Sequence, residues 1–384
     1  MDGVFIALTT RALANRTVLA GFRIENAAGN AIGGSNIRNV ELRNNTVTNP
    51  AERDIFLDDV GGSVVLFDNV VTGAAGSGPA SGQGILIRNS TTLNSSEITL
   101  AGFRADNNRV GIELTATGST APAQLPNQVI AIGPSSPVNT SIGTAGGAAV
   151  TNSASGNAAQ GVLIQANALG SQEVAIQNAT LSGNGAAGLE VVSGTPGGTL
   201  TAFQEVQIQG NAIANNAGPG IRIEANETAE QEFNIDRNRI VNNGGAGITS
   251  VSRNSSIQEF VAKPEINSLG IGANVIDGNG GPGISINSSN ADVLLVEVSQ
   301  NTLGTSVGPD LEITSNNSAR TCAVVFNNTG ITGTGAPALT FNNNSSLVYQ
   351  ISNLNSLAFD NNGAAVTLTP APGTFTDIAA RTCL

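Results

Sequence analysis

The sequence predicts an all-β fold: a single-stranded right-handed parallel β-helix (solenoid) of about 12 coils of about 27 residues, with loop insertions. Three observations predict it. A short phrase that usually opens with glycine recurs along the chain, asparagine recurs at fixed distances before it, and apolar pairs precede it at period two. We call the first residue of the phrase the anchor. The anchors are Gly84, Gly111, Gly161, Gly188, Gly220, Gly247 and Gly283, with Asp54, Asp310 and Ala338 as non-glycine equivalents.

The first strand of each coil is marked by two apolar residues, 14 and 12 positions before the anchor. Because side chains alternate along a strand, this spacing places both on one face, which we expect to point inward. The pairs are Val40 and Leu42, Val174 and Ile176, Val206 and Ile208, Phe233 and Ile235, Leu269 and Ile271, Val296 and Val298, and Val324 and Phe326.

The second strand carries one apolar residue, seven positions before the anchor, and the third begins at the anchor itself. The apolar residues of the second strand are Val47, Leu181, Ile213, Ile240, Ile276, Leu303 and Ile331. Three such short strands cannot bury their apolar faces alone, so the coils must stack, each strand pairing with its equivalent in the next coil.

Asparagine marks the bends between these strands. One set lies nine positions before the anchor, at Asn45, Asn211, Asn238, Asn274 and Asn301. A second lies four positions before it, at Asn107, Asn157, Asn184, Asn216, Asn243 and Asn279. Stacked at the strand spacing of about 4.8 Å, such amides can bond to one another and to corner backbone. We interpret the asparagines as structural columns, and the anchor glycine as the residue that permits a sharp turn.

Three other folds fit the sequence less well. A flexible low-complexity linker would not place asparagine at one fixed offset in six of the seven glycine-anchored coils. An antiparallel sandwich needs longer strands joined by hairpin turns, and a left-handed β-helix needs hexapeptide repeats, which are absent.

The phrase "NRIVNNGGAGI" (238–248), with "NAIANNAGPGI" and "NVIDGNGGPGI", resembles the parallel β-helix repeat of the pectate-lyase-like superfamily and of bacterial surface and autotransporter-passenger proteins. The resemblance covers roughly residues 20–370. It implies the fold but not an activity, because such repeats occur in enzymes and non-enzymes alike. We expect residues 1–384 to form a single β-helix domain, an excerpt of a longer solenoid.

The composition excludes several classes of partner. The net charge is −12 and Lys263 is the only lysine, so neither nucleic acid nor an anionic membrane surface is expected to bind. The chain has no run of eighteen apolar residues and does not begin with a secretion signal, so no membrane insertion is expected in this segment. Few charges and many Asn, Ser, Thr and Gly residues suggest an extracellular or cell-surface protein of a bacterium.

A site is expected on the outer face of the anchor strands, beside the longest insertions. There the ligand-groove candidates are Glu113, Glu190, Arg222 and Thr249, and the weak catalytic candidates are Asp54, Asp58, Asp59, Glu190 and Arg222. Glu190 and Arg222 lie one coil apart, as do Asp58 and Arg88. The functional interpretation is a carboxylate and a guanidinium facing a sugar acid. The structural one is a pair of exposed neighbours that contributes under about 1 kcal/mol.

The resemblance also implies what an enzyme of this fold needs. Lyases hold calcium with acidic residues and use Arg or Lys as the base, and hydrolases use paired carboxylates. Polygalacturonases carry Gly-His-Gly and alginate epimerases a histidine among acidic residues, but this chain has no histidine. We therefore expect no metal site and no cofactor, with calcium conceivable under the enzyme hypothesis alone.

The two cysteines recur in similar phrases, "RTCAV" at Cys322 and "RTCL" at Cys383. Their separation of 61 residues corresponds to two coils, about 9.6 Å at the strand spacing. Because a disulfide needs Cα atoms within about 7 Å, two free thiols at equivalent interior positions are predicted.

Two functions remain open. The first is a non-enzymatic extracellular or cell-surface solenoid that acts as a structural stalk or as an adhesin-like surface for glycans or proteins. The alternative is a polysaccharide lyase or hydrolase, or a glycan-binding module, that uses the groove over the anchor strands. The absence of Trp and the single Tyr disfavour sugar stacking.

Overall fold

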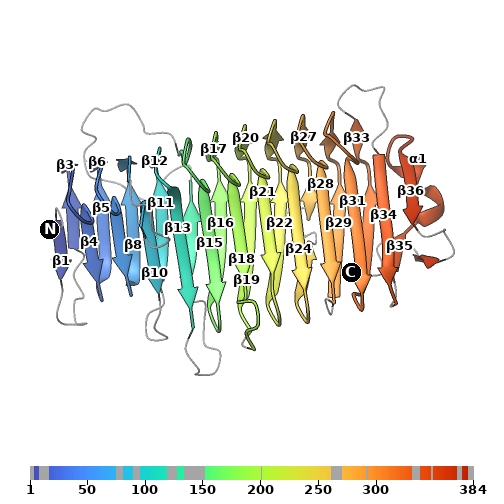
Figure 1. The fold of residues 1–384 in the computed structure, drawn as a ribbon, viewed down its shortest axis with the longest axis horizontal. Coiled ribbons are helices and arrows are strands. Elements are labelled where there is room, and N and C mark those ends of the chain that lie inside the picture. Colours follow the sequence, from blue (N-terminus) through green and yellow to red (C-terminus); the bar gives the residue numbers. More distant parts are fainter. Residues whose placement is uncertain are drawn as a thin grey trace. The chain divides into compact units, whose positions relative to one another are not determined.

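A computed structural model describes residues 4–7, 17–74, 81–89, 96–118, 128–133, 152–199, 201–260, 270–290, 293–330, 338–346, 349–369 and 374–378. The chain forms two compact units, residues 1–186 and residues 187–384. In each unit the strands of successive coils pair in parallel, which makes the fold a parallel β-helix, the predicted class (Figure 1). The winding is right-handed, as connections between parallel strands of one sheet almost always are.

In residues 1–186 the strands at the anchors, together with β1 (Val4–Ala7) and β4 (Ile32–Ser35) that pair in the same ladder, form the sheet that we call the anchor sheet. Its other members are β7 (Ile55–Asp58), β10 (Gln83–Asn89), β13 (Val110–Thr117) and β15 (Val162–Asn167). The strands that carry the apolar pairs form the pair sheet: β2 (Thr17–Ala20), β5 (Arg38–Arg43), β8 (Gly61–Phe67), β11 (Ser96–Ala101), β14 (Gln128–Ile132) and β16 (Ser171–Gln177). The short strands are β3 (Arg23–Glu25), β6 (Thr46–Thr48), β9 (Val70–Thr72), β12 (Arg104–Asp106) and β17 (Thr180–Ser182).

Residues 187–384 repeat this arrangement. The anchor sheet holds β18 (Leu189–Ser193), β21 (Ile221–Ala225), β24 (Ile248–Arg253), β28 (Ile284–Ser289), β31 (Leu311–Asn317), β34 (Ala338–Ser345) and β36 (Ala365–Thr369). The pair sheet holds β19 (Phe203–Gln209), β22 (Glu230–Asp236), β25 (Ile257–Phe260), β26 (Ile271–Gly272), β29 (Val293–Ser299), β32 (Thr321–Phe326), β35 (Tyr349–Ser352) and β37 (Thr376–Ile378). The short strands are β20 (Ala212–Ala214), β23 (Arg239–Val241), β27 (Val275–Asp277), β30 (Thr302–Leu303) and β33 (Thr329–Gly330), and a 3₁₀ turn at Leu354–Ser356 leads into the one-turn helix α1 (Leu357–Asp360).

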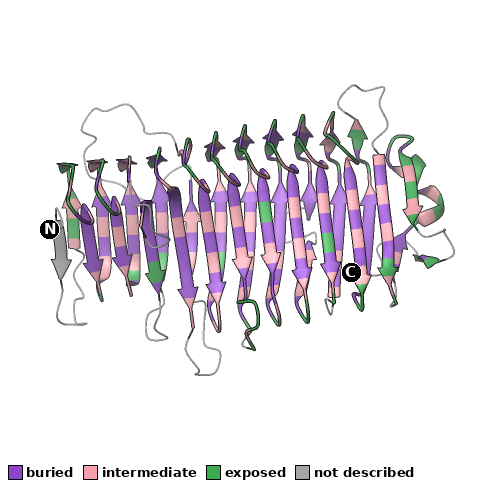
Figure 2. Cartoon of the chain, viewed as in Figure 1, coloured by how far each residue is buried: buried purple, intermediate pink, exposed green. Residues whose placement is uncertain are grey.

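Interior positions stack like over like. Ile221 pairs with Ile248, Ile248 with Ile284, and Ile284 with Leu311, and all four side chains are fully buried. Figure 2 shows the resulting alternation of buried and partly exposed residues along the strands. The core is therefore a set of apolar columns inside the coils, as the period of the sequence predicts.

One predicted apolar pair is shifted by a residue. Ala323 and Val325, not Val324 and Phe326, pair with the interior residues Val296 and Val298. Ala323 precedes the anchor Ala338 by 15 residues, whereas the first residue of each other pair precedes its anchor by 14. The fixed spacing therefore selects the wrong pair in this coil. Leu269 and Ile331, which were also predicted to be interior, lie outside the described residues.

The buried asparagines form hydrogen-bonded columns. In the longest, the side-chain Nδ2 of each residue donates to Oδ1 of the next at 2.8–3.0 Å, and its backbone N donates to the same Oδ1 at 2.9–3.2 Å. The members are Asn211, Asn238, Asn274, Asn301, Asn328 and Asn361, the last two of which the sequence pattern missed. In residues 1–186, Asn45 donates to Asn69 in the same way, at 2.9 Å.

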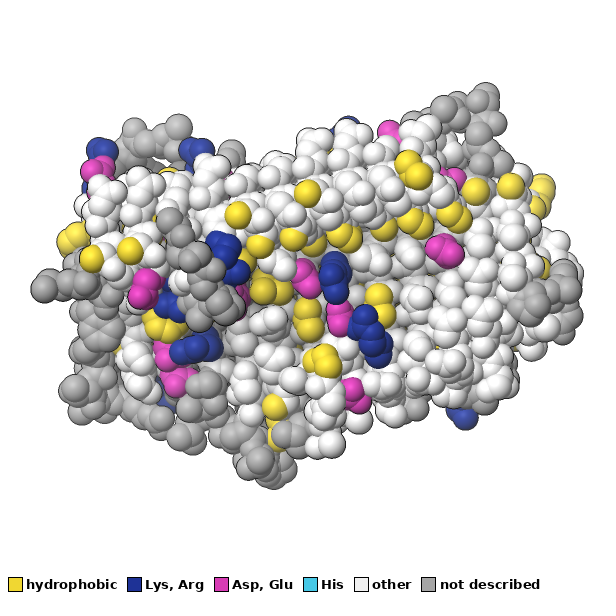
Figure 3. Space-filling view, viewed as in Figure 1, with side chains coloured by type: hydrophobic (Ala, Val, Ile, Leu, Met, Phe, Trp, Pro, Cys, Tyr) yellow, Lys and Arg dark blue, Asp and Glu magenta, His cyan; other side chains and the backbone are white. Residues whose placement is uncertain are grey.

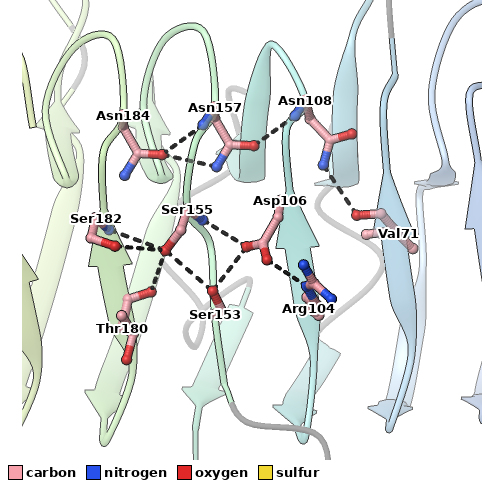
Figure 4. A network of polar contacts seen from close by, with 10 residues as sticks. All are labelled: Val71, Arg104, Asp106, Asn108, Ser153, Ser155, Asn157, Thr180, Ser182 and Asn184. Atoms are coloured by element: carbon pink, nitrogen blue, oxygen red, sulfur yellow. Dashed lines mark hydrogen bonds and ion pairs between the residues drawn. The ribbon is translucent and has the colours of Figure 1, made fainter.

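The second asparagine set needs one correction. Asn157 bonds Asn184 in the first unit, and Asn216 bonds Asn243, which bonds Asn279, in the second. Asn107 was predicted to belong to this set, but it is exposed, with φ of 56°. Asn108 is buried in its place and donates its backbone N to Asn157 Oδ1 at 2.9 Å (Figure 4). The turn before Gly111 is one residue shorter than the turns before Gly161, Gly188, Gly220, Gly247 and Gly283, so the fixed offset selected the wrong asparagine.

The anchor glycines have a different role from the predicted one. None of them has a positive φ; left-handed backbone lies instead at the other corners, at Asn26, Asn49, Asn215 and Asn242 among others. A Cβ added at Gly220 would lie 2.9 Å from Asn243 Nδ2 and 2.7 Å from the backbone oxygen of Gly247, both in the next coil. Glycine is therefore needed because the next coil's amide and backbone occupy the space of a side chain.

Buried glutamines form columns that the sequence pattern did not reveal. Gln231 donates to Gln204 at 2.8 Å, and Gln258 donates to Gln231 at 2.9 Å. In the first unit, Gln172 donates to Gln128 at 2.7 Å. All five side chains are fully buried. These interior amides are thus paired along the axis, which removes the cost of burying them singly.

The prediction of free thiols is wrong, because Cys322 is disulfide-bonded. Cys322 pairs with Gln350, and Gln350 with Thr376, so Thr376 takes the place two coils away that was assigned to Cys383. Cys322 also lies on the outer side of β32, because its neighbour Ala323 is the one that pairs with interior Val296. Cys383, the other cysteine of the sequence, lies outside the described residues.

A thiol titration checks this bond. We expect no thiol to react in protein unfolded without reductant, and two thiols to react after reduction. The Cys322→Ser variant should expose one reactive thiol without reductant. Two reactive thiols in unreduced, unfolded protein would contradict the disulfide.

Candidate functional site

The outer face of the anchor sheet is where the sequence predicts a site. Outward side chains alternate with the buried columns, so this face is built from every second residue of each anchor strand. Figure 3 shows charged side chains gathered in groups on this side, with a largely polar, uncharged surface over β28, β31 and β34.

In residues 1–186, two arginines converge on one aromatic ring. The guanidinium carbon of Arg53 lies 4.6 Å from the centre of the Phe56 ring, and that of Arg88 lies 5.4 Å from it. Arg53 belongs to the turn before β7, Phe56 to β7 and Arg88 to β10. We call Arg53, Phe56 and Arg88 the arginine–phenylalanine cluster. Each contact is a cation–π interaction worth about 0.5–1 kcal/mol at exposed sites.

Polar neighbours hold both guanidinium groups. Arg88 Nε donates to Asp58 Oδ1 at 2.8 Å, and this hydrogen bond raises the pKa of Arg88. Arg53 Nε donates to Gln83 at 3.2 Å, and Gln83 in turn donates to Glu113 at 2.9 Å. Burial lowers the pKa of Arg53. Asp58 and Glu113 are thus each engaged by a neighbour.

The acidic phrase at residues 54–59 does not converge on one point. Asp58 lies on the outer face and bonds Arg88. Asp54 is fully buried, and Asp59 lies at the corner that follows β7, with φ of 49°. Because these side chains point in different directions, they do not form the paired carboxylates that a glycosidase needs.

In residues 187–384, four charged side chains alternate in sign along the outer face. Arg222 Nε lies 3.4 Å from Glu190 Oε1, and its Nη2 lies 2.8 Å from Glu224 Oε2. Arg253 pairs with the other oxygen of Glu224. Burial by itself would raise the pKa of Glu224, but the hydrogen bond from Arg222 and the charge of Arg253 lower it overall. Glu190 and Arg222 are neighbours on adjacent strands, as the sequence predicts. Thr249 of β24 lies opposite Arg222 in the strand register.

Beyond this charged row the outer face carries amides and hydroxyls. We call it the neutral face: Ser285, Asn287 and Ser289 of β28, Thr314 and Asn316 of β31, and Thr340, Asn342 and Asn344 of β34, with Glu312 as its one charge. Asn316 Nδ2 donates to Asn287 Oδ1, and Asn344 Nδ2 donates to Asn316 Oδ1, both at 3.0 Å. Asn342 Nδ2 lies 3.1 Å from Thr314 Oγ1. The amides therefore have fixed orientations.

Figure 4 shows a further polar network, which is structural. Asp106 accepts from Ser153 Oγ and from the backbone N of Ser155, both at 2.8 Å, and from Arg104 Nε at 2.6 Å. It ties β12 to the segment that bridges to Thr180 after a long insertion. Both carboxylate oxygens of Asp106 accept hydrogen bonds within this network. The network therefore joins the chain on either side of the insertion and has a structural role.

Among the described residues, no group of three or more His, Cys, Asp or Glu side chains could hold a metal ion. A cavity beside α1 is lined by Val324, Phe326, Asn327, Ser352 and Asp360, on the outer side of the pair sheet. Asp360 accepts from Ser356 Oγ at 2.6 Å, and no second carboxylate lines the cavity. No helix in the described parts of the chain is long and apolar enough to cross a membrane.

No protein-family model matches the chain, and no curated protein matches its sequence. Among solved structures, the A-module of the Azotobacter vinelandii mannuronan C-5 epimerase AlgE4 is similar at 11% identity, over 91% of each chain, with a TM-score of 0.32. A likeness this weak says nothing about activity.

Proposed function

We propose that the protein is an extracellular β-solenoid that binds a polysaccharide along the neutral face without cleaving it. The observation that carries this proposal is the row Asn287–Asn316–Asn344, whose amides are held in place by one another. Sugar hydroxyls both donate and accept, and amides and hydroxyls complement them.

Two physical features favour a polymeric ligand. Equivalent side chains recur at the strand spacing of about 4.8 Å, so successive sugars of a chain would meet similar groups. Binding of one sugar then raises the effective concentration of the next. The fixed amides also lose little side-chain entropy when a ligand binds.

The charges on the anchor sheet favour binding over catalysis. Glu190, Arg222, Glu224 and Arg253 form one alternating row. A general acid or base needs a proton-transfer partner on the substrate, and these groups are engaged with one another. Disulfide-bonded Cys322 favours an oxidising compartment, in keeping with an extracellular location.

Binding to immobilised polysaccharides tests the proposal, with a neutral β-glucan, a neutral xylan and a polyuronate as probes. We expect a neutral polymer to bind, and the Asn316→Ala/Asn342→Ala double variant to lose at least about tenfold in affinity, since each lost hydrogen bond contributes about 1 kcal/mol. Gln207→Ala, on the outer side of the pair sheet, is the matched control and should bind like the parent. Equal binding by the double variant would overturn the proposal.

The same polymers test the enzymatic alternative. New reducing ends or unsaturated products, with or without calcium, would show cleavage. If such activity disappeared in Glu190→Ala or Arg222→Ala, the charged row would be an active site and the non-catalytic proposal would fail.

A further inference from the structure

One buried carboxyl group in residues 1–186 has no partner. Asp54 is the anchor before β7, and its backbone N donates to the backbone oxygen of Gln83 at 3.2 Å. Its side chain is fully buried, and neither oxygen has a hydrogen-bond partner. Leaving a buried polar group unpaired is costly, and a charge there is costlier still.

The position explains why the carboxyl group is unpaired. At the glycine anchors a side chain would point at the buried asparagine of the next coil: a Cβ on Gly84 would lie 2.4 Å from Asn108 Nδ2, and one on Gly111 would lie 2.7 Å from Asn157 Nδ2. In the coil after Asp54 this place is taken by Ala74, not asparagine: its backbone N donates to Asn108 Oδ1 at 2.8 Å, as the backbone N of Asn108 donates to Asn157 Oδ1. The aspartate therefore has room for its side chain but meets no amide.

Asp310 provides an internal comparison. It is also an anchor that is not glycine. Asp310 Oδ2 accepts from the backbone N of Ala338 at 2.8 Å, so this carboxyl group has a donor. The two aspartates share a position in the repeat and differ in their partners.

Burial alone raises the pKa of Asp54 from 3.8 to about 8. Its own turn carries Glu52 and Arg53; β4, β6 and β9 carry no titratable side chain. β10 carries Arg88 and β13 carries Glu113, both on the outer face. None of these charges contributes to the shift.

We propose that Asp54 makes the pairing of β7 with β10 sensitive to pH, so that this part of the first unit opens as the carboxyl group ionises. β7 carries Phe56 and Asp58, and the turn before it carries Arg53. Opening would therefore also separate the arginine–phenylalanine cluster. The inference is independent of the proposed polysaccharide binding.

The direction follows from linkage. The closed state holds the proton up to about pH 8, and the open state loses it above about pH 3.8. The contribution of the Asp54 proton to the stability of the closed state is fully present below pH 3.8. It is lost progressively as the pH rises to about 8. Across that window the opening equilibrium constant rises about tenfold per pH unit.

Hydrogen exchange at pH 5 and pH 7, corrected for the intrinsic exchange rate, tests the proposal. In the parent protein, protection of the β7 and β10 amides should fall about 100-fold between these pH values. Asp54→Gly, which restores the common anchor residue, and Asp54→Asn, which keeps the side-chain size, should each show less than a threefold change. Asp310→Gly is the matched control and should leave the fall in β7 and β10 intact.

Two results would overturn the proposal. One is a parent protein whose β7 and β10 protection does not change between pH 5 and pH 7, which needs no variant to observe. The other is an equal fall in the parent and in both Asp54 variants, which would assign the pH dependence to other groups.

Discussion

Gly220→Ala is expected to lower the free energy of unfolding of residues 187–384 by about 3 kcal/mol or more, the upper range for overpacking. The added methyl group would lie 2.6 Å from Ile240 Cγ2, 2.7 Å from the Gly247 oxygen and 2.9 Å from Asn243 Nδ2. A backbone oxygen in a parallel ladder cannot move without breaking its own pairing. Equilibrium denaturation in urea measures the loss.

Gly197→Ala is the matched control, because it separates steric overlap from backbone strain. Gly197 has φ of 76°, and an added Cβ would meet nothing within 4 Å. Its cost should be the left-handed strain of alanine, about 1 kcal/mol. If Gly197→Ala proved the more damaging change, lack of space would not be the reason for glycine at the anchor.

Asn238→Leu is expected to cost at least about 3 kcal/mol, since it leaves several buried groups without partners, each at about 1–3 kcal/mol. Asn238 Oδ1 accepts from the backbone N of Asn211 at 2.9 Å and from its Nδ2 at 3.0 Å. Asn238 Nδ2 donates to the Ile208 oxygen at 2.8 Å. Leucine is of similar size but supplies neither donor nor acceptor.

Asn344→Leu controls for the general effect of this substitution. Asn344 is exposed on the neutral face and bonds only the side chain of Asn316 among its described contacts. A change within about 0.5 kcal/mol is expected, as for most surface sites. Both variants should be compared by urea denaturation at one pH. Similar losses in the two would show that the buried column does not stabilise the coils.

The candidate site was predicted in part. The sequence placed Glu190 beside Arg222 and Asp58 beside Arg88, because neighbouring coils in register bring equivalent positions together. It did not reveal that Glu224 and Arg253 extend the first pair, or that Arg53 and Arg88 meet at Phe56. A long flexible side chain can pair with any of several neighbours, and the local geometry decides which pair forms.

The sequence by itself determined the winding. A repeated pattern of apolar residues at period two, with asparagine at fixed offsets, is satisfied when equal positions stack, and Ile221 over Ile248 and Asn216 over Asn243 follow from it. The choice of Asn108 over Asn107, the disulfide at Cys322 and the space around Gly220 were decided by the tertiary structure. Each depends on where one coil lies against the next. A single residue more or less in a turn changes that contact while the repeat stays recognisable in the sequence.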